Sequence, residues 1–182
     1  LEVLVGGGLG LLLLGLMAAL LVPSVSLFHH QSGLAEAQQV VCVVSDRIRQ
    51  GLLSTRPQTI AAHAGGRGLS WRPGDSLQPF SPTGQRQLRG HFLVYSWNAA
   101  RQEVSFTPWS PGGYDFTTVA ALSSSQLPPL PTAQTRVLGR HVTHFHVSFP
   151  ITFPLELEIT VSPPGPRRQA SWSLRQQISQ LP

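Results

Sequence analysis

The sequence predicts an α+β protein in which one long N-terminal helix packs on a C-terminal antiparallel β-sheet head. First, residues 3–22 include no charged side chain, and 20 helical residues span about 30 Å, the thickness of a bilayer's hydrocarbon core. Second, the helical period continues beyond this run as far as Leu53. Third, fifteen of the sixteen prolines lie at or after Pro57, which excludes long helices there and favours short strands joined by turns.

The pattern divides the chain into a transmembrane half-helix (1–22), an amphipathic half-helix (23–56) and a head (57–182). Pro57 disfavours helix at the preceding residue, so we expect the helix to end near Ser54. Pro23 removes one helical hydrogen bond, and we expect a bend there. Apolar residues recur at three- and four-residue steps along the amphipathic half: Leu34, Ala37, Val41, Val44, Ile48 and Leu52.

The sequence of the head predicts a series of short strands. Residues 155–161 show the cleanest alternation, with Leu155, Leu157, Ile159 and Val161 on one face, and we expect the apolar stripe of the helix to pack on that face. Residues 58–87 predict irregular structure with at most one short strand, near 68–72. The remaining expected strands are 91–97 and its hairpin partner 102–107, then 114–122, 134–138, 141–149 and 170–174, followed by a frayed polar tail over 176–182.

The N-terminal region carries a resemblance. Residues 1–5 read LEVLV, an apolar run follows, and the sequence continues with SLF at 26–28 and QSGLAEAQQ at 31–39. This pattern resembles the N-terminal methylation helix of type IV pilins and type II secretion pseudopilins. The resemblance covers about 53 residues and departs from the family at the triple glycine 6–8 and in the distance of Pro23 from the acidic residue.

The resemblance implies a fold and a set of partners. In that family a basic leader ending in Gly is cut before a Phe that becomes N-methylated, and a Glu just inside the mature chain acts in assembly. That Glu maps onto Glu2, and the leader would lie upstream of Leu1. The implied partners are other pilin or pseudopilin subunits, the prepilin peptidase, the inner-membrane assembly platform with its ATPase, and membrane lipid.

The head carries a second resemblance. A tyrosine-bearing strand with its hairpin partner precedes a V-x-F-x-V type strand, an L-x-L-x-I-x-V strand and a last strand. This order is similar to the heads of W-type minor pilins and J-type minor pseudopilins. Many pilins close a C-terminal loop with a disulfide, whereas Cys42 is the one cysteine here and cannot form an intrachain disulfide. Its valine-rich surroundings on the helix predict a buried, inert thiol.

Small residues at four-residue spacing mark the apolar half of the helix. Gly6 and Gly10, and likewise Gly15 and Ala19, would let neighbouring helices approach closely. The alternative is that these glycines merely reflect the frequency of glycine in membrane spans.

Candidate metal ligands are few. His144 and His146 share a strand face and could hold a divalent ion, while His141 is expected on the opposite face. Glu156 and Glu158 also share a face, where they could bind calcium or act as an acid pair, or simply be solvated. We expect no metal and no cofactor. Nucleophile, zinc-protease, dithiol and phosphate-loop motifs are absent from the sequence, which predicts a protein that is not an enzyme.

The charge pattern leaves two interpretations open. All thirteen basic residues are arginine against eight acidic residues, a net charge of +5. Such a chain favours anionic partners, including weak, nonspecific DNA binding. The alternative is an arginine-rich codon usage in a high-GC genome without a dedicated basic site.

Taken together, these observations predict a minor pilin or pseudopilin of the bacterial inner membrane, with a single span and a head in the periplasm or outside the cell. Pilus, secretion and DNA-uptake systems all use this subunit plan. One alternative is a single-span membrane-anchored binding module whose arginine-rich head holds DNA or glycan. The other is a secreted hydrolase with an uncleaved anchor, which the missing motifs disfavour.

Overall fold

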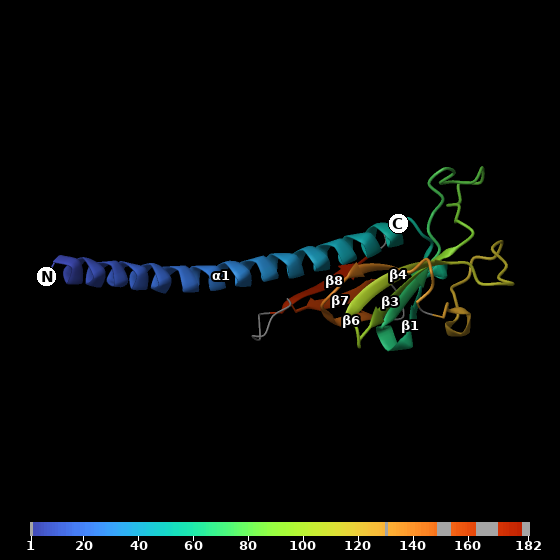
Figure 1. The fold of residues 1–182 in the computed structure, drawn as a ribbon. Coiled ribbons are helices and arrows are strands. Elements are labelled where there is room, and N and C mark those ends of the chain that lie inside the picture. The colour runs from blue at the N-terminus through green and yellow to red at the C-terminus, as the bar shows by residue number, and fades with distance from the viewer. Residues whose placement is uncertain (1, 130, 149–153, 163–170, 180–182) are drawn as a thin grey trace.

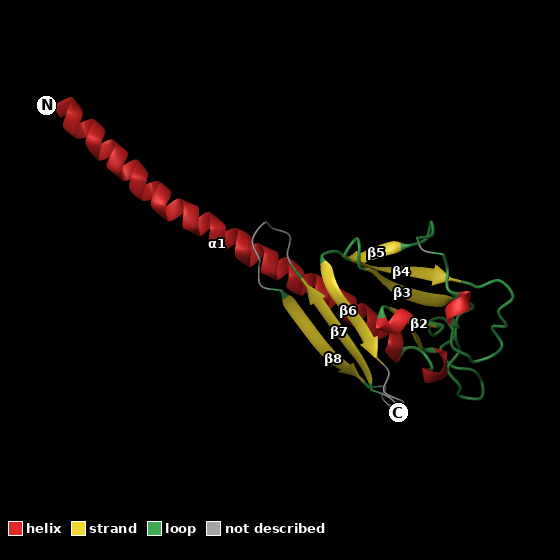
Figure 2. Cartoon of the chain, turned by 90° about the horizontal axis from the view of Figure 1, so that it is seen from below, coloured by secondary structure: helices red, strands yellow, loops and turns green. Residues whose placement is uncertain are grey.

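The fold is that of a computed structural model, which describes residues 2–129, 131–148, 154–162 and 171–179, with side chains described from Gly6 onward. One long helix, α1 (Glu2–Leu53), is followed by two antiparallel sheets (Figure 1). The structure confirms the predicted α+β class. The N-terminal half of α1 projects away from the head, and its C-terminal half lies along both sheets (Figures 1 and 2).

The described strands form two antiparallel sheets, and in each sheet the strands are neighbours in the order in which they follow one another along the chain. The first has five strands in the order β1-β2-β3-β4-β5, namely Ala61–His63, Gly68–Trp71, Phe92–Asn98, Glu103–Trp109 and Arg136–Gly139. The second has three in the order β6-β7-β8, namely Val142–Ser148, Leu155–Val161 and Trp172–Ile178. Short 3₁₀ segments lie between α1 and β1 (Pro57–Thr59), between β1 and β2 (Ala64–Gly66) and between β4 and β5 (Ser124–Gln126).

The helix is continuous through Pro23. The helix as a whole curves gently (Figures 1 and 2). Proline removes a backbone donor, and beside it the hydroxyl of Ser24 donates a hydrogen bond of 2.7 Å to the carbonyl of Leu20. The chain therefore stays helical on both sides of Pro23. Two short-range bonds, from Ser54 N to Gly51 O and from Thr55 N to Leu52 O, close the last turn near the expected end.

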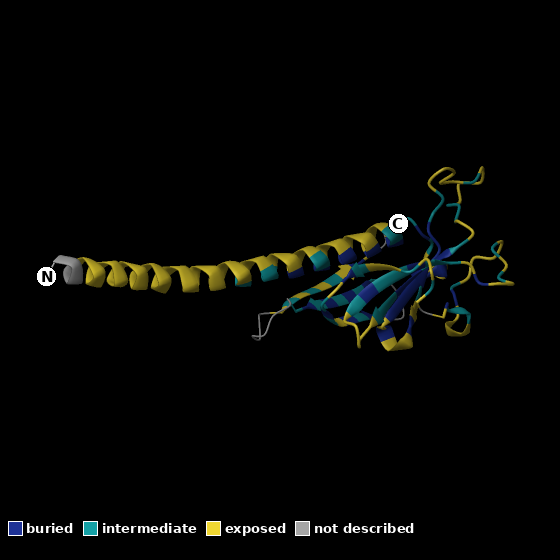
Figure 3. Cartoon of the chain, in the orientation of Figure 1, coloured by how far each residue is buried: buried dark blue, intermediate teal, exposed yellow. Residues whose placement is uncertain are grey.

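One core joins the helix to both sheets. The stripe of α1 is buried together with residues of β2, β3, β4, β6, β7 and β8, including Trp71, Tyr95, Phe145 and all four apolar residues of β7. Alternation along β7 is complete, because its apolar positions are buried and its polar positions are half-buried. The amphipathic half of α1 is thus part of the head's own core (Figure 3).

A smaller cluster lies on the other face of the first sheet, because Phe92 and Val94 alternate with Tyr95 along β3. Phe92, Val94 and Leu122 are buried there, with Tyr114 and Phe116 among the half-buried aromatics around them. The expected strand over 114–122 is wrong. Instead the Asp115 carboxylate accepts hydrogen bonds from the backbone N–H and the hydroxyl of Thr117, which fixes a turn that excludes extended pairing.

Three further expectations need correction. A strand over 61–63 (β1) pairs with β2, although only one strand was expected in that region. The expected frayed tail is strand as far as Ile178, because β8 pairs with β7 along its whole length. Alternation along 141–149 predicts Val142 on the face of His144 and His146. Instead Val142 is buried with Phe145, since a register shift between Val142 and His144 moves it to the core face. Residues 163–168, where the prolines and glycine of the sequence predict a turn, lie outside the described residues.

Candidate functional site

The uncovered half of α1 is the most distinctive surface of the molecule. Figure 3 shows it exposed on all sides as it leaves the head. Its most apolar 18-residue window has a mean hydropathy of 2.4 and no buried residue. The large apolar side chains exposed along it are Leu9, Leu11, Leu12, Leu13, Leu14, Leu16, Met17, Leu20, Leu21, Val22, Val25, Leu27 and Phe28. This helix is long and apolar enough to cross a membrane.

The small residues of this half lie on an open surface of the described helix. A Cβ added at Gly6, Gly10 or Gly15 would meet no atom within 4 Å, and Ala19 is exposed. Their compactness therefore serves no packing within the described structure, and a neighbouring helix could approach there. Glu2 begins α1, and its side chain lies outside what the structure describes.

The covered half of α1 is seated closely on the head. Val41, Val44, Ile48 and Leu52 are fully buried, whereas Leu34, nearer the free half, is half-buried. Glycine permits the closest approaches: a Cβ at Gly51 would lie 2.8 Å from Cε2 of Trp71, and one at Gly139 would lie 2.6 Å from Cγ1 of Val40. Ser45 adds a polar anchor by donating a 2.5 Å hydrogen bond to Oε1 of Gln176.

Cys42 does not follow the predicted burial. Cys42 is exposed because it lies on the side of α1 that faces away from the sheets, whereas its neighbour Val41 points into the core. Val43 on the same side is 48% exposed. A helix buries only the residues whose direction matches the sheets, and an apolar local sequence does not decide that direction.

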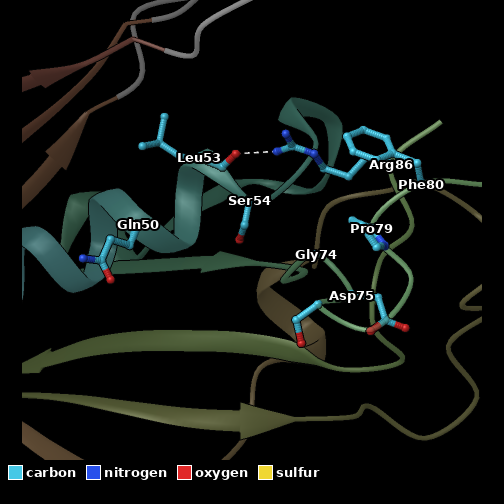
Figure 4. Close-up of a pocket in the computed structure, with 9 residues that line it drawn as sticks. Gln50, Leu53, Ser54, Gly74, Asp75, Pro79, Phe80 and Arg86 are labelled. Carbon is cyan, nitrogen blue, oxygen red and sulfur yellow. Dashed lines mark hydrogen bonds between the residues drawn. The ribbon is translucent and has the colours of Figure 1, made fainter. Parts of the chain in front are cut away.

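A pocket lies where α1 ends (Figure 4). Residues 50–54 form one side and residues 74–86 of a long hairpin form the other, enclosing about 460 Å³. The guanidinium of Arg86 donates to the carbonyl of Leu53 and lies 6.0 Å from the ring centre of Phe80. A cation on a terminal helix carbonyl satisfies an unpaired acceptor and complements the helix dipole. The side chains of Leu77 and Phe80 on this hairpin are exposed.

The predicted histidine cluster is only partly assembled. The rings of His144 and His146 lie 6.3 Å apart on the outer face of β6, and Nε2 of His144 is 3.8 Å from a carboxylate oxygen of Glu158. His141 lies before β6 with a positive φ of 60°. Among the described residues, no three His, Cys, Asp or Glu side chains form a group suited to a metal ion.

The two glutamates of β7 belong to a polar ladder. Glu156 accepts hydrogen bonds of 3.1 Å from Arg175 and 3.0 Å from Gln177, both on β8. These hydrogen bonds, that from Gln177 first, lower the pKa of Glu156. Glu156 and Glu158 therefore face cross-strand partners on this exposed face.

Most head arginines within the described residues are also engaged. Arg72 donates to the carbonyls of Arg89 and Thr118, and Arg56 donates to the carbonyl of Arg86. Further pairs among the described residues are Arg86 with the carbonyl of Leu53, Arg89 with Ser76, Arg140 with Glu103 and Arg175 with Glu156. A guanidinium held by protein oxygens has fewer free donors for phosphate, so the fold spreads the positive charge over structural roles.

Two notable features were missed by the sequence reasoning. His63 is buried on β1, 2.7 Å from the hydroxyl of Ser70. Trp109 lines a second pocket together with His91. A histidine between two alanines and a tryptophan beside a proline resemble ordinary surface residues, and no local signal would have identified either of them.

No protein-family model, curated protein or solved structure matches this chain.

Proposed function

We propose that this protein is a structural subunit of a pilin-like filament, a minor pilin or pseudopilin. The observation that carries the proposal is that one continuous helix has two environments. Its apolar N-terminal half is free of the head, and its C-terminal half belongs to the head's core. A helix of this kind can anchor a subunit in a bilayer before assembly. In the assembled filament the same apolar surface would contact the helices of other subunits instead of lipid.

In this proposal the inner membrane holds the free half of α1 before assembly, with the head in the periplasm. The exposed leucines contact lipid, and the glycines that meet no atom of their own chain become contact points between helices. The partners are other pilin or pseudopilin subunits, a prepilin peptidase and an assembly platform. No catalytic step is assigned to the chain.

Glu2 provides the test of this proposal. A carboxylate within an apolar span costs about 2.5–3.5 kcal/mol at the centre and less near the interface. Its removal should therefore leave membrane insertion intact. In a filament the same carboxylate would pair with a positive group such as the N-terminal amine of a neighbouring subunit, and its loss would leave that charge unpaired.

The experiment expresses the complete gene with Glu2→Leu and follows processing, membrane level and recovery in sheared filaments, together with secretion activity. We expect normal processing and membrane level but reduced filament recovery and secretion. Glu36→Leu, at an exposed position of the amphipathic half, is the matched control and should assemble normally. Normal assembly of the Glu2→Leu protein would remove the main residue-level support for a pilin-type mechanism.

A further inference from the structure

A second pocket lies at the edge of the first sheet, where β4 ends and β5 is about to begin. Residues 108–110 form one wall, residues 132–134 form the other, and His91 lies beside them. The hollow has a volume of about 590 Å³, within the usual range of small-molecule sites, roughly 300–1,000 Å³. We call it the Trp109 pocket.

The indole of Trp109 is held in one orientation. Its Nε1 donates a 2.8 Å hydrogen bond to the carbonyl of Gln126, and its ring packs on the cluster of Phe92, Val94 and Leu122. The side chain is half-buried, so part of it is still available to the pocket. A fixed aromatic ring presents a preformed apolar surface at little entropic cost.

The opposite wall is also preformed and is polar. The hydroxyl of Thr135 lies 2.9 Å from the hydroxyl of Thr107 on β4, and it accepts a 2.8 Å hydrogen bond from the backbone N–H of Thr132. This arrangement fixes the turn that carries Gln134. The side chain of Gln134 is exposed, and among the described residues its amide has no hydrogen-bond partner.

The pocket is electrically neutral. Its lining includes no Asp, Glu, Lys or Arg. The pKa of His91 is lowered by burial, with smaller contributions from Arg89 and Arg72, so this imidazole is uncharged at neutral pH. No charged side chain in the lining would compensate the hydration that a charged ligand loses on entry, so a neutral ligand is favoured.

We propose that the Trp109 pocket binds a neutral saccharide unit. The C–H groups on one face of a pyranose ring are positively polarised and complement the negative face of an indole. The ring hydroxyls need neutral donors and acceptors around them. The side-chain amide of Gln134 supplies both, and the hydroxyl oxygen of Ser110, which donates to the carbonyl of Gly90, can still accept. A neutral peptide matches this pocket less well, because the lining combines one aromatic surface with dispersed amide and hydroxyl groups.

The position of the pocket suits a ligand outside the membrane. The loops that follow β4 and precede β5 lie at the end of the head farthest from the N-terminus of α1 (Figure 1). A chain anchored by that helix would present the pocket away from the bilayer, toward cell-wall glycan or extracellular polysaccharide. The proposal concerns the head alone and does not depend on filament assembly.

The test titrates the full-length protein, in a detergent without a sugar headgroup, with chitobiose and with maltose, and follows saturation-transfer NMR signals and tryptophan fluorescence. Chitobiose represents N-acetylated cell-wall glycan, and maltose represents unsubstituted glucan. We expect saturable binding of at least one of them, and the preferred sugar identifies the source. Absence of binding to both sugars would overturn the proposal, as would saturable binding of a neutral, end-blocked Pro-Tyr-Pro peptide with no sugar binding.

Two variants locate the binding. Gln134→Ala removes one neutral hydrogen bond and should weaken the affinity about threefold to tenfold without affecting folding, because the side chain is exposed. Trp109→Phe keeps an aromatic ring in the cluster and should weaken it about twofold to tenfold. The matched controls are Gln58→Ala and Trp172→Phe, both remote from the pocket, and they should bind normally. Unchanged affinity in both pocket variants would show that the sugar binds elsewhere.

Discussion

Single polar residues in the core of the head depend on close partners. Thr55 and Thr59 are buried with their hydroxyls 2.9 Å apart, and His63 reaches the hydroxyl of Ser70. Trp71 is an exception among the described side chains, because its buried Nε1 has no partner. Its ring is stacked on Tyr95 at a centroid distance of 4.6 Å, so packing retains a group that lacks a hydrogen bond. Burial, opposed in part by Arg47, raises the pKa of Tyr95 to about 12.

His63 should make the stability of the head depend on pH. Burial lowers its pKa in the folded protein below the ordinary value of 6.5, so the unfolded chain binds a proton more readily. The stability that the folded protein gains from keeping His63 neutral is therefore fully present above about pH 6.5. It is lost as the pH falls from there through the lowered pKa of the folded protein. Thermal unfolding followed between pH 8 and pH 5 should show the melting temperature decreasing toward acid.

Substitutions can distinguish the effect of His63 on this pH dependence from that of His91, whose pKa is also lowered. His63→Gln should remove part of the acid dependence, His91→Gln should remove another part, and the double variant should be nearly flat in this range. If His63→Gln retains the whole acid dependence of the wild type, burial of this imidazole is not its cause.

At the scale of elements, α1 combines two kinds of surface in one uninterrupted helix. The free half is apolar around its circumference, as expected for a helix surrounded by lipid. The covered half has a single buried stripe, and Gly51 and Gly139 allow it to approach the sheet closely. The head and the second half of the helix should therefore fold as one unit.

Ile48→Asp tests the seam between helix and head. The side chain is fully buried among residues of both sheets, so an aspartate would place an unpaired charge in the core. In a shortened chain beginning at His29 we expect a loss of about 3–5 kcal/mol in the free energy of unfolding, measured by urea denaturation.

Val43→Asp is the matched control, since it introduces the same charge on the side of α1 facing away from the sheets. Surface substitutions of this kind change stability by about 0.5 kcal/mol or less. Equal stability of the two variants would show that the seam does not hold the head together.

At the scale of the whole molecule, the positive charge is distributed and largely engaged. The net charge of +5 favours anionic surfaces, but the guanidinium groups of the head mostly serve backbone carbonyls and carboxylates. Any contact with nucleic acid should accordingly be weak and electrostatic.

The DNA prediction can be checked by gel retardation of the chain beginning at His29. Retardation at 50 mM salt should vanish by 200 mM, because each phosphate contact releases counter-ions and is weakened steeply by salt. Scrambled and natural duplexes should behave alike. Binding that persists at 200 mM and distinguishes sequences would instead favour a dedicated nucleic-acid-binding head.

The spacing of apolar residues was enough to predict those elements in which the buried residues recur at the period of a helix or of a strand. The helix over the first fifty-three residues, the hairpin of β3 and β4 and the strand β7 could all be derived from the spacing of apolar side chains. Each of these elements places its apolar residues on faces defined by its own geometry. The sequence by itself therefore determined the α+β class, the candidate membrane span and the apolar stripe of the helix.

Contacts between distant residues decided the rest. The shift in β6 that buries Val142 and the exposure of Cys42 both depend on neighbours that the local sequence does not specify. The Trp109 pocket likewise exists because Thr107 and Thr135, 28 positions apart, meet side by side. Periodicity records which side of an element is apolar, whereas the direction that side faces, and the hollows left between loops, are set when the elements pack together.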